Sequence, residues 1–185
     1  MTDMLLLALD PGTRHTGYAI LDGAYALQDC GTWRPESRLR GMSRDLWLKG
    51  RLLALIAQWQ PSHIIFEDFV WQEDKGKDHK FVQGRADMER LIGGIQMLAL
   101  LPPQPKVSAA LPQVWGREFC GYTHHTKHDI AVVVNHRLGT SFRGDQDDNH
   151  AADCAALACW HLDHLHYQAR LDAAERLAHQ RRRRR

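Results

Sequence analysis

Long apolar runs are missing from this sequence of 185 residues, and no stretch approaches the length that a membrane span requires. Cysteine is scarce as well: only four are present and none has the CxxC spacing, which favours reduced cytosolic thiols. The N-terminus has neither the charged start nor the small-residue cleavage site of a secretory signal. These absences predict a cytoplasmic protein that has no membrane partner.

Internal repeats and interdomain linkers are also absent from the sequence. Hydrophobic residues make up 44% of the chain and charged residues 25%, which is ordinary for a globular protein, and the length suffices for one core. We therefore expect a single α/β domain over residues 1–170. Residues 171–185 are expected to form a basic C-terminal tail that is disordered at its end.

Charge is nearly balanced over the whole chain, with a formal net charge of +2, but it is unevenly distributed. Basic residues gather over residues 34–51, residues 75–90 and the terminal run Arg181–Arg185. Such clusters suit a polyanionic partner. Solvated helix faces and a disordered tail would explain the same clusters, so charge alone does not decide between them.

Hydrophobic periodicity and turn residues predict the order of the secondary structure elements. Strands are expected over residues 4–10, 16–22, 24–33, 63–69 and 106–111. Helices are expected over residues 38–59, 81–100, 112–119 and 128–137, and from about residue 148 past residue 170. Three consecutive strands followed by alternating helices and strands predict a five-stranded mixed sheet flanked by helices, whose first three strands are antiparallel.

Acidic side chains stand at the ends of these core elements. Asp10 ends the first apolar run before a tight turn, where a charge is costly unless a cation or a hydrogen-bond donor compensates it. Glu67 ends a second buried run, and an acidic cluster that includes Asp153 opens the last helix. His150 lies three residues before Asp153, on the same helix face. Converging carboxylates suggest a site for divalent metal.

Each of these residues also has a simpler interpretation. Asp10 could simply stabilise its turn and have no catalytic role, and His150 could be a structural histidine. Asp147 or Asp148 could cap the last helix, where the helix dipole favours an acid. Glu67 has fewer such explanations, because an unpaired buried glutamate is rare.

Three segments resemble the motifs of RuvC-type Holliday junction resolvases: residues 9–19 (LDPGTRHTGYA), residues 64–67 (IIFE) and residues 150–158 (HAADCAALA). The resemblance implies an RNase H-like fold and a homodimer that cleaves four-way junction DNA symmetrically. It also implies that Mg²⁺ or Mn²⁺, two ions in each active site, is the cofactor. Carried over by motif, the catalytic and metal-binding residues are Asp10, Glu67, His150 and Asp153.

The resemblance further implies that the segment after Glu67 enters the junction. Phe69 and Trp71 are then candidates for an apolar wedge between bases. Candidates for phosphate contacts are Lys75, Lys77 and Lys80. This charged segment also fits a phage-type member of the family, which would work without branch-migration partners.

Other residues fall near positions where the family contacts DNA or its own partner subunit. Lys127 matches a basic residue near the scissile phosphate. Trp115 stands where the family has another basic residue, which Arg117 could replace, and Arg14 in the first motif is a further candidate for DNA contact. The expected helix 81–100 corresponds to the dimer interface.

Other functions share parts of this pattern. An RNase H-like nuclease acting on other branched DNA or on RNA–DNA hybrids would use the same residues, and a monomeric protein would favour it. The first motif also resembles the phosphate loop of actin-like ATP-binding proteins, which need a second lobe. A junction-binding protein that does not cleave is a further alternative. The sequence leaves open the cleavage preference, the metal used in the cell and the protein partners, including branch-migration machinery.

Overall fold

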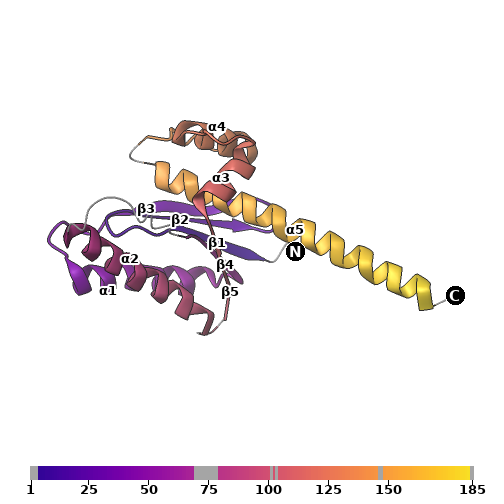
Figure 1. Ribbon diagram of the computed structural model, residues 1–185, viewed down its shortest axis with the longest axis horizontal. Coiled ribbons are helices and arrows are strands. Elements are labelled where there is room, and N and C mark those ends of the chain that lie inside the picture. The colour runs from indigo at the N-terminus through magenta and orange to yellow at the C-terminus, as the bar shows by residue number, and fades with distance from the viewer. Residues whose placement is uncertain (1–3, 69–78, 101, 103, 146–147, 184–185) are drawn as a thin grey trace.

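The computed structural model describes residues 4–68, 79–100, 102, 104–145 and 148–183. These residues form one mixed sheet with helices on both faces (Figure 1). Helices α1 and α2 lie on one side of the sheet, and α3, α4 and the first half of α5 lie on the other. Within the described residues, no helix is both long and apolar enough to cross a membrane.

The sheet has five strands in the order β3-β2-β1-β4-β5. Strand β1 (Leu5–Asp10) is central: it pairs antiparallel with β2 (Thr16–Asp22) and parallel with β4 (His63–Glu67). Strand β3 (Leu27–Trp33) continues the antiparallel half, and β5 (Lys106–Ala110) continues the parallel half. The mixed five-stranded sheet predicted from the sequence is confirmed.

The helices follow the expected order. They are α1 (Gly41–Trp59), α2 (His79–Met97) with a 3₁₀ turn at Leu98–Leu100, α3 (Pro112–Cys120), α4 (Lys127–Leu138) and α5 (Asn149–Arg183). Strand β3 begins three residues later than expected, because the Asp22 carboxylate accepts hydrogen bonds from the backbone N–H groups of Ala24 and Ala26. This turn extends the connection between β2 and β3.

Successive side chains of the central strand point to opposite faces of the sheet, so a hydrophobic core forms on each face. Leu6 and Ala8 of β1 pack towards the cluster that contains α5, whereas Leu7 and Leu9 pack towards the cluster that contains α1 and α2. All four side chains are buried. The strand that ends in Asp10 is therefore held rigidly between two layers.

Small residues allow α5 to lie very close to the sheet. Five alanines of its first three turns are buried: Ala151, Ala152, Ala155, Ala156 and Ala158. The backbone of β2 approaches α5 at Gly17, where an added Cβ atom would lie only 2.4 Å from the carbonyl oxygen of His150. This close approach places the start of α5 over the ends of the central strands.

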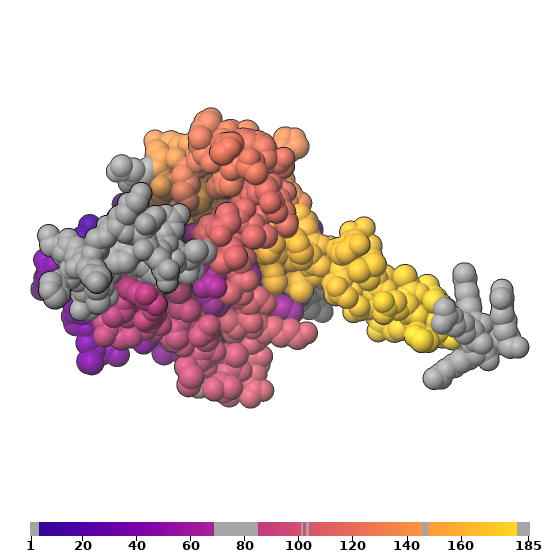
Figure 2. Space-filling model, in the orientation of Figure 1, coloured from indigo at the N-terminus to yellow at the C-terminus, as the bar shows by residue number. Residues whose placement is uncertain are grey.

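The second half of α5 leaves the body of the protein. Leu162 is still buried, but residues 170–180 are all exposed, and the helix projects away from the sheet (Figures 1 and 2). Residues 171–183 continue the same helix, so the boundary expected at residue 170 coincides with no change of secondary structure. Of the terminal arginine run, Arg181–Arg183 belong to this helix, and residues 184–185 lie outside the described part of the chain.

Candidate active site

Two acidic side chains meet at one edge of the sheet because their strands are parallel neighbours. Asp10 is the last residue of β1 and Glu67 is the last residue of β4, and the preceding residues Leu9 and Phe66 are paired in register. The first turns of α5 bring His150 and Asp153 to the same edge. The four residues expected to act together are therefore neighbours in space.

Asp10 and His150 form a direct contact across 140 residues of sequence. The Nδ1 atom of His150 lies 2.6 Å from Oδ2 of Asp10. This hydrogen bond, more than any other cause, raises the pKa of the His150 imidazole. The contact orients the ring and leaves Nε2 as the ring nitrogen that can face a substrate or a ligand.

Asp153 is almost completely buried and pairs with Lys127. Only 2% of the Asp153 side chain is exposed, and its Oδ2 atom accepts a hydrogen bond from the Lys127 ammonium. Burial raises the pKa of Asp153, and the charge of Lys127 opposes this shift. The other oxygen, Oδ1, is buried and has no hydrogen-bond partner among the described residues. An unsatisfied buried carboxylate oxygen indicates that this position receives a cation or a donor that the chain does not itself supply.

The position of Lys127 follows from local sequence. Thr126 caps the N-terminus of α4: its hydroxyl accepts a hydrogen bond from the Asp129 backbone N–H, and the Asp129 carboxylate accepts one from the Thr126 backbone N–H. This capping box starts α4 at Lys127, so the first turn of α4 lies beside α5. Burial lowers the pKa of the Lys127 ammonium, but the carboxylates of Asp153, Asp10 and Glu67 together outweigh this effect and raise it.

Glu67 is the most strongly perturbed carboxyl group of the site. Burial, and next to it the negative charge of Asp10, raise the pKa of Glu67 to about 7. The indole Nε1–H of Trp115 donates a hydrogen bond of 3.0 Å to Oε2 of Glu67. Trp115 is only 2% exposed, so this donor is fixed in place. The sequence had suggested only that a basic contact was lost at Trp115, and its role as a donor to Glu67 was missed.

Because the resemblance implies that Glu67 binds metal, we expect Trp115→Phe to lower metal affinity and catalytic rate about 10- to 100-fold, the usual effect of removing a hydrogen bond that orients a metal ligand. The phenyl ring fills most of the indole volume but leaves Oε2 of Glu67 without its donor. Mn²⁺ titration calorimetry and single-turnover cleavage would measure both effects. Trp160→Phe is the matched control, because Trp160 donates to Glu118 outside the site, and it should leave both quantities unchanged.

His15 is a second imidazole beside the site that the sequence did not single out. Its ring stacks on the ring of His150 with centroids 5.5 Å apart. The β1–β2 loop that carries it is closed by a hydrogen bond of 2.7 Å from the Thr16 hydroxyl to the Gly12 carbonyl. No signal in the sequence indicated this stacking, because it depends on where α5 crosses the loop.

The donor set suits a hard divalent cation. Three carboxylates at one sheet edge supply the oxygen ligands that Mg²⁺ and Mn²⁺ prefer, and the free Oδ1 of Asp153 is one of them. As arranged here, however, the described residues contain no group of three ligating side chains close enough to hold one ion. His150 contacts one carboxylate oxygen of Asp10, and Lys127 contacts one carboxylate oxygen of Asp153.

The structure locates only some of the other residues that were expected to contact DNA. Phe69, Trp71, Lys75 and Lys77 lie outside the described residues, as does the side chain of Lys80 near the start of α2. Arg14 is exposed on the β1–β2 loop, and Arg117 is exposed on α3, two residues after Trp115. These two contacts with DNA remain predictions.

Asp148 has a structural explanation of its own. Its carboxylate accepts hydrogen bonds from the backbone N–H groups of Arg143 and Gly144, at 2.7 and 2.9 Å. Both of its oxygens are therefore occupied in shaping the loop before α5. Asp147 lies outside the described residues.

Comparison with curated proteins gives crossover junction endodeoxyribonucleases among the relatives of this chain. The chain is 25% identical over 158 residues to the crossover junction endodeoxyribonuclease RuvC of Prochlorococcus marinus, covering 84% of this chain and 96% of that protein. It is 26% identical over 171 residues to the RuvC of Pelotomaculum thermopropionicum, covering 91% of this chain and 98% of that protein. No family model matches the chain.

Solved structures agree with these sequence relatives. The fold is similar to that of T. thermophilus RuvC in complex with Holliday junction substrate, with a TM-score of 0.70 at 20% identity over 85% of this chain and 92% of that one. It is also similar to the yeast mitochondrial Holliday junction resolvase Ydc2, with a TM-score of 0.63 at 12% identity over 95% of this chain and 83% of that one. The resemblance to RuvC-type resolvases and the RNase H-like fold class, both predicted from the motifs, are confirmed.

Proposed function

We propose that this chain is a metal-dependent endonuclease that resolves four-way DNA junctions by paired, symmetric cuts. The observation that carries the proposal is the convergence of Asp10, Glu67 and Asp153 from three separate elements at one sheet edge. Relatives named crossover junction endodeoxyribonucleases, which align over nearly their whole length, support the choice of substrate.

Asp10, Glu67, His150 and Asp153 would hold two Mg²⁺ or Mn²⁺ ions. Bound divalent cations supply Lewis-acid activation of a phosphodiester and of the water that attacks it. Asp10 lies on the central strand between Glu67 and His150, so it is the ligand best placed to be shared. The three carboxylates disfavour one another's charge, and this repulsion favours a cation over water at the site.

Lys127 and His150 supply the remaining chemistry. Lys127 carries a positive charge beside Asp153, where it can neutralise a non-bridging phosphate oxygen of the substrate. His150, held through Nδ1 by Asp10, can ligate metal through Nε2 or accept a proton from the attacking water. Either role requires the ring orientation that Asp10 imposes.

Paired cuts require two active sites at a fixed separation, and hence a homodimer. Helices α1 and α2 and the turn after α2 offer an apolar surface for it. Five large side chains there are between 49% and 76% exposed: Met42, Leu46, Leu53, Met97 and Leu100. An exposed apolar surface of this kind favours association with a second copy.

The test is incubation of the full chain with a labelled synthetic four-way junction and Mg²⁺ or Mn²⁺, beside linear duplex, flap and RNA–DNA hybrid substrates. The proposal predicts symmetric nicks in two opposing strands of the junction and little cleavage of the linear duplex. Sedimentation should give a dimer. A monomer that prefers flaps or hybrids would favour the RNase H-like alternative, and tight ATP binding would favour the actin-like one.

Metal binding should depend on pH through Glu67. Its pKa of about 7 means that the metal-free protein holds a proton there at lower pH, and ligation must displace that proton. Mn²⁺ affinity should therefore rise about tenfold for each pH unit below the pKa of Glu67 and level off above it. Calorimetry in buffers with different ionisation enthalpies would count the proton released. A proton count unchanged in Glu67→Gln would assign the release to another group.

A further inference from the structure

A groove of about 340 Å³ is lined in part by His15, whose ring stacks on His150 of the candidate active site. Three segments form it: the β1–β2 loop, the connection between β3 and α1, and the first turns of α1. Four of the residues that line it are arginines: Arg14, Arg34, Arg40 and Arg44. This concentration of guanidinium groups accounts for the start of the basic cluster seen over residues 34–51 of the sequence.

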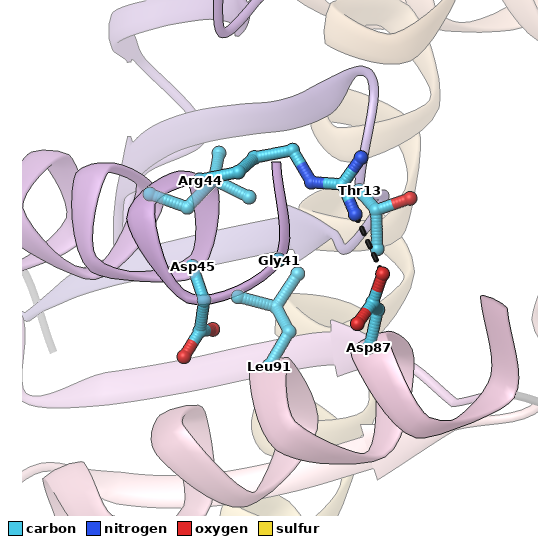
Figure 3. A pocket seen from close by; sticks show the side chains of 7 residues that line it. Thr13, Gly41, Arg44, Asp45, Asp87 and Leu91 are labelled. Carbon is cyan, nitrogen blue, oxygen red and sulfur yellow. Dashed lines mark hydrogen bonds and ion pairs between the residues drawn. The ribbon is translucent and has the colours of Figure 1, made fainter. Parts of the chain in front are cut away.

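The carboxylates near the groove cancel only part of this charge. Arg44 forms an ion pair of 2.6 Å with Asp87 of α2, which ties α1 to α2 beneath the loop (Figure 3). Glu36, which also lines the groove, pairs at 2.6 Å with Arg38 instead of with a lining arginine. Arg14 and Arg40 are exposed, and neither forms an ion pair with another described residue. The groove therefore retains a net positive charge.

His15 connects the groove to the candidate active site. His15 lines the groove and also stacks on His150, which in turn contacts Asp10. Arg14 and Arg34 line the same groove as His15. A ligand in the groove would thus be separated from His150 by the ring of His15.

We propose that this groove binds the sugar–phosphate backbone of the DNA strand that adjoins the scissile phosphate. Guanidinium groups bind phosphate oxygens in a bidentate manner, and several of them along one groove suit a polymer with several phosphates better than a single small anion. Among the described residues that line the groove, the apolar side chains are Leu39 and Pro35, and the aromatic ring is that of His15, which already stacks on His150. The contact would position the strand without reading its sequence. This inference rests on the proposed function, because it concerns the substrate of the same site.

The first test removes two groove charges and measures the salt dependence of binding. Arg34→Gln/Arg40→Gln should weaken junction binding in the absence of divalent cations, and each lost phosphate contact should reduce the slope of log affinity against log salt by about 0.9. Fluorescence anisotropy with a labelled junction at several salt concentrations gives the slope. The expected change for the double variant is therefore a decrease of about 2.

Arg170→Gln/Arg176→Gln is the matched control. It removes the same charge from exposed positions of α5, at least 17 residues after Asp153 and therefore about 25 Å or more along the helix. This control should keep the wild-type slope. An unchanged slope in the groove variant overturns the proposal. An equal decrease in both double variants also overturns it, because the loss would then follow net charge and not the groove.

The second test locates the contact on the DNA. Neutral methylphosphonates placed one at a time beside the cut site should weaken wild-type binding at one or two neighbouring positions. The groove variant should lose this sensitivity at the same positions, and full retention would contradict the proposal. If the wild-type protein shows no preference for junctions but the groove variant still has a smaller slope on linear DNA, the proposed function fails and the groove inference stands.

Discussion

Asp10→Asn is expected to reduce junction cleavage by about 10³-fold or more, because metal activation of a phosphodiester contributes several kcal/mol to the transition state. Asp10 ends the central strand and lies near both Glu67 and His150, so the change alters the proposed ligand set at its centre. Asn keeps the shape of the side chain but removes its negative charge. Single-turnover cleavage of a labelled junction measures the effect.

Junction binding should survive this substitution. Phosphate contacts come from basic side chains, and Asp10→Asn removes none of them, so affinity measured without divalent cations should stay within about twofold of wild type. Asp22→Asn is the matched control. Asp22 also ends a strand next to β1, but it pairs with Leu5 at the opposite end of the sheet from Asp10. Normal cleavage by Asp10→Asn would remove this residue from the active site.

Gly17→Ala is expected to destabilise the protein by about 3 kcal/mol and to disturb the active site as well, because overpacking a tight contact typically costs about 1–3 kcal/mol. The added methyl group would lie 2.4 Å from the His150 carbonyl oxygen and 2.9 Å from the Cys154 sulfur. The backbone of α5 must therefore move away from β2. That movement displaces His150 from Asp10 and Asp153 from Lys127, so catalytic rate should decrease together with stability.

Thermal unfolding followed by circular dichroism would test this expectation, with a decrease in melting temperature of roughly 6–12 °C. Gly50→Ala is the control: it adds the same methyl group in the middle of α1, at an exposed position with no atom within 4 Å. Ala is the better helix former by about 1 kcal/mol, so this variant should be as stable as wild type or more so. Equal stability of the two variants would show that α5 tolerates a wider separation from β2.

The sequence predicted the fold well because the signals that it uses are local. Apolar runs and their periodicity identified all five strands and the order of the helices, and three consecutive strands before the first helix indicated the antiparallel half of the sheet. Element ends were less accurate. The start of β3 depends on the Asp22 side chain bonding to the turn, a contact that no periodicity reveals.

The fold brings the four expected site residues together because each lies at or near the end of an element. A strand end is recognisable in the sequence, and parallel neighbours such as β1 and β4 bring their carboxyl ends to one edge. The partners of these residues were not predicted. Trp115 contacts Glu67, and Lys127 contacts Asp153, only because α3 and α4 pack over α5. Lys127 was expected near the site by resemblance alone, and its pairing with Asp153 is a finding of the structure.

The sequence by itself determined which side chains carry charge at the ends of core elements, since hydrophobic periodicity and turn residues are properties of neighbouring positions. The tertiary structure alone decided how those charges are balanced. It paired Asp10 with His150 and Glu67 with Trp115, and it gathered the arginines of two distant connections into one groove beside His15. The physical reason is that electrostatic and hydrogen-bond energies depend on distances of a few ångströms between residues that lie far apart along the chain.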